Sequence, residues 1–111
     1  MIGRVTITQN NGKKYTAFVR KNGGITFGRG KDCDIRILDT RLSRVHCKVL
    51  EEDGSYYIVD AGSTNGTFLN NEKVDRAQIA EGDVITIGTN SGEFDLVEED
   101  MDLYGNWKAK V

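Results

Sequence analysis

Four side chains able to bind anions or move protons stand within six positions of one segment, LDTRLSRVHCKVL at residues 38–50. They are Arg41, Ser43, Arg44 and His46, which is the only histidine of the chain. Such a group suits a catalytic site, an anion-binding loop or a polar connection between two strands. The rest of the sequence decides among these three possibilities.

Two catalytic patterns are testable against the sequence, and both fail. A Ser/His/Asp hydrolase needs an acidic residue to orient the histidine, but no Asp lies within three positions of His46. The stretch FGRGKDCD superficially resembles a nucleotide-binding phosphate loop, yet Lys31 is followed by Asp32, and the earlier glycine of that pattern would fall at Ile25. We therefore expect no enzyme activity and a structural role for the lone histidine.

Charge is distributed unevenly along the 111 residues, whose formal net charge is −2. Residues 28–48 contain six basic and three acidic residues, whereas residues 93–102 contain six acidic residues and no basic one. A local positive region on an acidic protein favours a small anionic target over nucleic acid. The alternative, a chance imbalance on a solvated strand edge, is equally compatible with the charges alone.

Several other protein classes find no support in the sequence. Cys33 and Cys47 do not form a CxxC pair, and one histidine cannot complete a Cys₂His₂ set, so we expect two reduced thiols, no metal and no cofactor. No run approaches the roughly 18 apolar residues of a membrane span. The start MIGRVTITQNN has no signal-peptide core. We expect a monomeric cytoplasmic protein without membrane contact.

The elements that must position these residues are predicted to be strands. Apolar residues alternate with a period of two in short segments that include RVTIT, YTAFV, HCKVLEE, SYYIVDA, DVITIG and GEFDLVEE. Turn sequences such as NNG, NGG, EDGS, EGD and NSG separate them, and no segment has a sustained helical repeat. This pattern predicts an all-β sandwich or barrel.

One hairpin predicts which loops meet. Residues 46–52 and 55–61 flank the tight turn at Asp53-Gly54, so they should pair antiparallel. The segment TRLSRVH, which enters the first strand, then lies beside AGSTNGT, which leaves the second. Arginine forks, the hydroxyls of Ser43 and Thr64 and accessible backbone N–H groups at glycines would suit a phosphate dianion. The side chain of Asn65 has both a donor and an acceptor for a peptide backbone.

At this point the sequence resembles a forkhead-associated (FHA) domain over about residues 3–97. The resemblance lies in Gly28-Arg29, in Ser43 and His46 of LSRVH, and in the Asn65-Gly66 pair of STNGT. GDVITIG also resembles the family's late core strand. One departure is visible, because the family's second Asn-Gly pair reads Asn70-Asn71. Asn tolerates left-handed backbone better than most residues, so the turn can survive.

The resemblance implies an eleven-stranded antiparallel β-sandwich whose loops at one end bind phosphothreonine peptides. It also assigns roles to eight residues. Arg29 and Ser43 are expected to hold the phosphate, with further phosphate contacts from Arg44 and Thr64. Asn65 is expected to bond the peptide main chain, and Gly28, His46 and Gly66 to support the site. Only the resemblance places Arg29 there.

For Arg41 the sequence leaves two roles open. Its loop is expected near the segment downstream of the phosphothreonine, where a guanidinium would favour an acidic residue about three positions further on. Alternatively, Arg41 is exposed and only raises the local positive potential. The last segment, residues 98–111, breaks the strand pattern and is expected to be a partly ordered extension or a linker after an FHA domain of residues 1–97.

The function implied by the resemblance is a phosphothreonine-dependent interaction module that docks proteins phosphorylated by a Ser/Thr protein kinase. A phospho-independent scaffold that uses the same fold is the main alternative. The presence of Arg29, Ser43 and Asn65 argues against it, since a silent site has no need for them.

Overall fold

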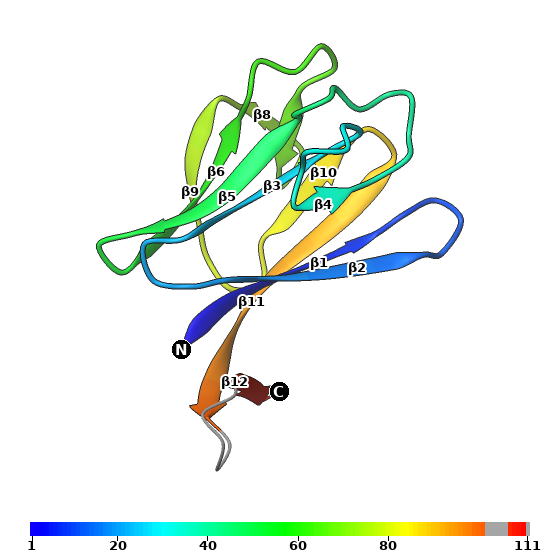
Figure 1. The fold of residues 1–111 in the computed structure, drawn as a ribbon. Helices are drawn as coiled ribbons and strands as arrows, with labels where there is room; N and C mark the ends of the chain where they lie inside the picture. The colour runs from blue at the N-terminus through cyan, green and yellow to red at the C-terminus, as the bar shows by residue number, and fades with distance from the viewer. Residues whose placement is uncertain (102–106, 111) are drawn as a thin grey trace.

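The computed structural model describes residues 1–101 and 107–110. In that part of the chain the regular secondary structure consists of β-strands alone (Figure 1). Strands β1–β11 form two sheets packed against each other, which confirms the predicted eleven-stranded sandwich, and β12 pairs only with β11. The strands are β1 (Ile2–Thr8), β2 (Lys14–Val19), β3 (Gly24–Gly28), β4 (Ile35–Arg36), β5 (Cys47–Glu52), β6 (Ser55–Asp60), β7 (Thr67–Leu69), β8 (Glu72–Val74), β9 (Arg76–Ile79), β10 (Val84–Ile87), β11 (Asn90–Met101) and β12 (Trp107–Lys110).

The sheets have the orders β2-β1-β11-β10-β7-β8 and β4-β3-β5-β6-β9. Their neighbouring strands pair antiparallel with one exception, the two-residue strand β4, which runs parallel to β3. β4 is therefore a short edge strand, and the long loop that follows it is free to cross the end of the sandwich.

The core lies between the sheets and follows the predicted alternation. Inward-facing residues from both sheets are almost completely buried, such as Val5 and Ile7 of β1, Val49 of β5 and Ile85 and Ile87 of β10. Burial of each such side chain stabilises the fold by roughly 1.5–3 kcal/mol relative to exposure. The rigid core fixes the strand ends from which the loops leave.

Two tight turns confirm the turn chemistry read from the sequence. The β5–β6 hairpin pairs Cys47 with Asp60 at its open end, and its turn places Asp53 and Gly54 at positive φ. The β7–β8 turn places Asn70 at φ 49° and Asn71 at φ 70°, so the Asn-Asn pair adopts the left-handed backbone that Asn-Gly would adopt. The departure from the family pattern therefore leaves this turn intact.

The end of β11 extends beyond the sandwich, where its last residues pair with β12 (Figure 1). Residues 102–106 and 111 of the expected C-terminal extension lie outside the described residues. The described part of the chain contains no helix that could cross a membrane.

Candidate functional site

Three loops meet at one end of the sandwich, and the hairpin predicted the meeting of two of them. They are the β3–β4 loop, the β4–β5 loop and the β6–β7 loop (Figure 1). The backbone N–H of Thr64 donates to Ser43 Oγ over 3.1 Å, and Asn65 Nδ2 donates to the carbonyl oxygen of Arg41 over 2.8 Å. These bonds join the β4–β5 loop to the β6–β7 loop directly.

The loops surround an open hollow of about 340 Å³. All six residues predicted to contact phosphate or peptide line it, namely Arg29, Arg41, Ser43, Arg44, Thr64 and Asn65. Thr40 and Leu42 complete the lining. The structure thus brings the predicted binding residues together, including Arg29, which the hairpin argument alone could not place.

Arg29 is held to the β4–β5 loop through two bonds. Its backbone N–H donates to the Ser43 carbonyl over 3.0 Å, and its Nε donates to the Leu42 carbonyl over 3.1 Å. Both terminal Nη groups are then left to donate to a ligand. This geometry gives the hollow a planar cationic fork at a defined position.

Ser43 is oriented by its neighbours in both loops. Because its Oγ accepts from the Thr64 N–H, the hydroxyl hydrogen remains able to donate elsewhere. Its backbone N–H donates to Nδ1 of His46 over 3.2 Å. These contacts within the protein already hold the Ser43 hydroxyl at the hollow.

His46 is completely buried and joins the two loops from beneath. Its Nδ1 accepts from the Ser43 N–H, and its Nε2 lies 2.8 Å from the carbonyl oxygen of Gly66. A backbone N–H only donates and a carbonyl only accepts, so the neutral imidazole with its proton on Nε2 satisfies both bonds. The geometry agrees with the predicted supporting position of His46.

Gly28 and Gly66 meet different backbone requirements. A Cβ at Gly28 would collide with the carbonyl group of Arg44 and lie 2.9 Å from the backbone nitrogen of His46. At that position only glycine lets the end of β3 approach the β4–β5 loop. Gly66 has φ 91°, which other residues rarely adopt, and its carbonyl accepts the bond from His46.

Arg41 forms an ion pair that neither of its two predicted roles included. Its Nε lies 3.1 Å from Oδ1 of Asp39, a carboxylate whose other oxygen accepts from Nδ2 of the buried Asn90 over 3.0 Å. Burial raises the pKa of Asp39, but the bonds from Arg41 and Asn90 outweigh it and leave that pKa below its usual value. Asp39 thus anchors the loop that carries Arg41.

Asp60 performs a similar task for the β6–β7 loop and was not singled out in the sequence. Its carboxylate accepts from the backbone N–H groups of Gly62 and Ser63 and from the hydroxyls of Ser63 and Thr67. Burial raises the pKa of Asp60, but these hydrogen bonds more than compensate and lower it. Asp60 lies two and three residues before the N–H groups that donate to it, which is the pattern of an Asx turn. This short-range pattern was a signal in the sequence for the role of Asp60.

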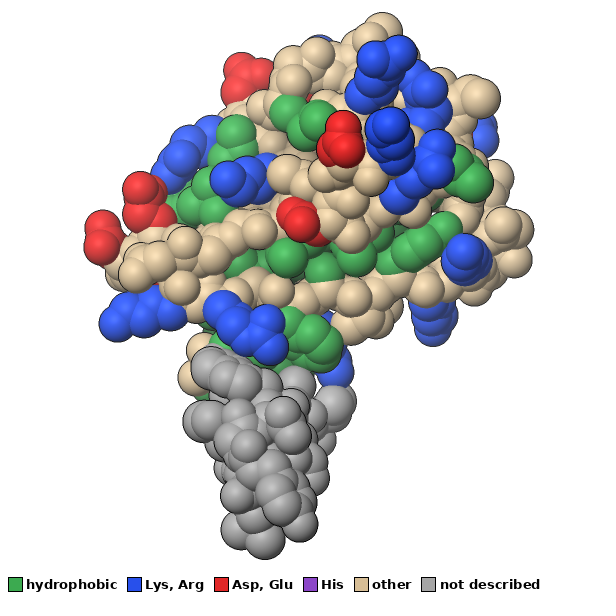
Figure 2. All heavy atoms as spheres, in the orientation of Figure 1, with side chains coloured by type: hydrophobic (Ala, Val, Ile, Leu, Met, Phe, Trp, Pro, Cys, Tyr) green, Lys and Arg blue, Asp and Glu red, His purple; other side chains and the backbone are tan. Residues whose placement is uncertain are grey.

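Positive charge gathers over these loops. Figure 2 shows several Lys and Arg side chains close together at the upper right, where Figure 1 places the loops on either side of β4. The described residues contain no group of three or more His, Cys, Asp or Glu side chains suited to a metal ion. Cys33 and Cys47 are both free thiols, and burial raises the pKa of Cys47 to about 12.

Comparison with known sequences places this arrangement in a family. The sequence profile of the FHA domain matches residues 25–88. FHA domain-containing protein FhaA of Mycobacterium tuberculosis is 38% identical over 84 residues, which are 76% of this chain and 16% of that protein. Glycogen accumulation regulator GarA of Mycolicibacterium smegmatis is 46% identical over 61 residues, which are 55% of this chain and 39% of that protein. The chain thus spans well under two thirds of these relatives.

Solved structures agree with the sequence match. A structure from a study of phosphothreonine-dependent FHA domain interactions superposes with a TM-score of 0.74 at 31% identity, over 86% of this chain and 97% of that one. The FhaA FHA domain, complexed with the intracellular domain of Rv3910, gives 0.71 at 32% identity, over 84% and 99%. The chain therefore belongs to the family of FHA domains.

Proposed function

We propose that this chain is a phosphothreonine-dependent interaction module that docks proteins phosphorylated by a Ser/Thr protein kinase. The observation that carries the proposal is the single hollow shared by Arg29, Ser43, Thr64 and Asn65. Its donors suit a ligand that offers only acceptors, as a phosphate dianion does. A solved relative at 31% identity comes from work on phosphothreonine-dependent FHA domain interactions, which supports the same assignment.

Each residue has a distinct proposed role. The Nη groups of Arg29 and the hydroxyl of Ser43 hold the phosphate, and Arg44 and Thr64 add contacts at its edge. Asn65 already donates to the Arg41 carbonyl through Nδ2, so its Oδ1 is the atom that accepts from a peptide N–H. Arg41 favours an acidic residue downstream of the phosphothreonine. Its ion pair with Asp39 weakens this preference, because the pair neutralises part of the charge of Arg41.

The phosphate supplies enough free energy to decide whether binding occurs. A hydrogen bond that involves a charged group contributes about 1.5–3 kcal/mol, so three or four of them contribute roughly 5–10 kcal/mol before ordering costs. A micromolar complex requires about 8 kcal/mol. Residues beside the phosphothreonine then tune affinity and cannot replace the phosphate.

The proposal includes several expectations about the protein as a whole. The domain extends over residues 1–97, with 98–111 as an extension. The protein acts in the cytoplasm as a monomer that binds and does not catalyse. The curated relatives include a glycogen accumulation regulator and an oxoglutarate dehydrogenase inhibitor, names that describe regulators and not catalysts.

The decisive experiment is a titration with a degenerate peptide library built around one phosphothreonine, together with its unphosphorylated counterpart. We expect micromolar binding of the phosphorylated library alone. Arg29→Gln should weaken it by at least about a hundredfold, because it removes two or more charged hydrogen bonds. Lys21→Gln, which removes the same charge at an exposed position outside the hollow, should leave it within about twofold. Equal binding of the unphosphorylated library would instead indicate a phospho-independent scaffold.

A further inference from the structure

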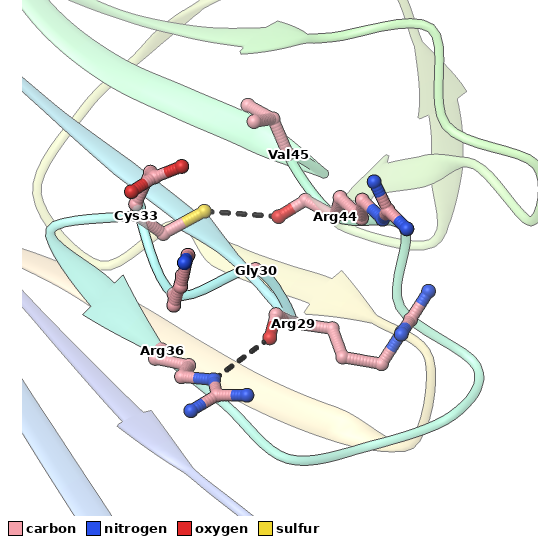
Figure 3. Close-up of a pocket in the computed structure, with 8 residues that line it drawn as sticks. Arg29, Gly30, Cys33, Arg36, Arg44 and Val45 are labelled. Atoms are coloured by element: carbon pink, nitrogen blue, oxygen red, sulfur yellow. Dashed lines mark hydrogen bonds between the residues drawn. The ribbon is translucent and has the colours of Figure 1, made fainter.

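A second hollow adjoins the first at the same end of the sandwich. It encloses about 450 Å³ and is lined by residues 29–33 of the β3–β4 loop together with Arg36, Arg44 and Val45 (Figure 3). We infer that this hollow binds a second anionic group of the partner chain, a carboxylate or a second phosphate. The inference rests on the proposed function, because the phosphothreonine is what brings the partner to this end of the domain.

The lining of the second hollow is strongly cationic. Four basic side chains, Arg29, Lys31, Arg36 and Arg44, face a single carboxylate, that of Asp32. Arg29 and Arg44 line both hollows, so the two share a wall. In Figure 3 their guanidinium groups extend toward one side of the view, and Cys33 and Arg36 lie on the other. A ligand in the first hollow therefore lies next to the second.

Within the described residues, these four cations differ from several other basic side chains in having no ion-pair partner. Arg4, Arg41 and Arg76 each form an ion pair, with Asp95, Asp39 and Glu52 respectively. Among the residues whose side chains the structure describes, no carboxylate forms an ion pair with any of the four cations of the second hollow. The Asp32 carboxylate offsets part of their mutual repulsion, and solvent ions or an anionic ligand relieve the rest.

The frame of the hollow is already built. The Arg44 carbonyl accepts from the Gly30 N–H over 2.9 Å and from Cys33 Sγ over 3.0 Å, which joins the two loops that form its walls. Arg36 Nε donates to the Arg29 carbonyl over 3.0 Å, so the Arg36 fork is held in place with both Nη groups left for a ligand (Figure 3). The Arg36 side chain therefore loses less conformational entropy when a ligand binds.

The position of the hollow sets where the second anion must lie on the partner. Arg41 and Asn65 line only the first hollow, whereas Lys31 and Arg36 line only the second. A peptide that crosses the phosphothreonine site therefore meets Arg41 on one side of the phosphothreonine and Lys31 on the other. The second anion lies on the side away from Arg41 and Asn65.

The test is a scan along one phosphothreonine peptide, in which a single Glu or a single phosphoserine replaces Ala at each position on either side. We expect affinity to rise only for substitutions on one side of the phosphothreonine, by about threefold for Glu and about tenfold for phosphoserine. These gains in affinity should depend on Lys31. Lys31→Gln should remove these gains and change binding of the singly phosphorylated peptide by less than about twofold. Lys21→Gln loses the same charge elsewhere and should preserve them.

The outcomes separate this inference from the function on which it rests. If the singly phosphorylated peptide binds but no substitution gives a gain that Lys31→Gln removes, the second site does not exist. If Lys21→Gln removes the gain equally well, the effect is the general positive field of the domain and not a site. Failure of the singly phosphorylated peptide to bind at all would overturn the proposed function first. The size of the gain with Glu relative to phosphoserine distinguishes a carboxylate ligand from a second phosphate.

Discussion

Nε2 of His46 lies 2.8 Å from the carbonyl oxygen of Gly66, twenty residues further along the chain. The other ring nitrogen accepts from the N–H of Ser43. One buried side chain thus sets the distance between the loop that presents the Ser43 hydroxyl and the loop that presents Thr64 and Asn65. His46 thus fixes the relative position of the two loops without lining the hollow.

His46→Ala should lower the free energy of unfolding by about 3–5 kcal/mol, because it leaves a cavity and two polar backbone groups without partners. Urea denaturation measures the loss. His46→Gln offers a donor and an acceptor at similar reach and should recover part of it. A loss below about 1 kcal/mol for His46→Ala would show that the two bonds contribute little.

Gly28→Ala should destabilise the domain by about 3 kcal/mol or displace the β4–β5 loop, because the new methyl group would collide with the Arg44 backbone. Thermal unfolding and the binding titration together distinguish these two results. Gly12→Ala is the control, since Gly12 has φ 87° but open space around it. It should cost about 1 kcal/mol through backbone strain alone. Equal losses in both variants would exclude the close approach as the reason for glycine at position 28.

Asn71→Gly should stabilise the domain by about 0.5–1 kcal/mol, because φ 70° is strained for Asn and unstrained for Gly. Asn70→Gly should have the opposite effect. The Asn70 side chain accepts from the Val84 N–H over 2.9 Å and donates to Asp83 over 3.1 Å, and glycine would lose both bonds. Chemical denaturation of the two variants beside the parent decides the sign, and a stabilising Asn70→Gly would contradict the assigned contacts.

The carboxylate of Asp60 should make stability depend on pH below neutrality. Its hydrogen bonds lower its pKa in the folded protein from an unfolded value near 3.8, so the folded state favours the ionised form. The resulting stabilisation is fully present above the unfolded pKa and is lost as the pH falls through the folded pKa.

Asp60→Asn should therefore reduce the free energy of unfolding at pH 7 by about 1–3 kcal/mol and flatten its decline below pH 4. Denaturant titrations at a series of pH values give both quantities. Asp75→Asn, a change at an exposed position, should leave the curve parallel to that of the parent. If the Asp60→Asn curve kept the parent's slope below pH 4, the Asp60 carboxyl would not be the group that titrates.

Local patterns in the chain were sufficient to predict the strands, the β5–β6 hairpin and the meeting of the loops around Ser43 and Asn65. Alternation and tight turns are short-range properties, and one antiparallel pair brings together the ends of its two connecting segments. The FHA motif added Arg29, whose place in the hollow no short-range argument gives.

Other features depended on contacts between residues far apart in sequence, which no local pattern encodes. Asn90 donates to Asp39 across 51 positions, and this contact orients the partner of Arg41. The second hollow exists because Arg36 folds back onto the Arg29 carbonyl and the Arg44 carbonyl accepts from the β3–β4 loop. In the sequence Lys31 and Arg36 are simply part of a basic stretch. Packing of the β3–β4 loop against the β4–β5 loop places them around one hollow. That packing depends on hydrogen bonds to backbone carbonyls, whose donors come near only when the whole chain folds.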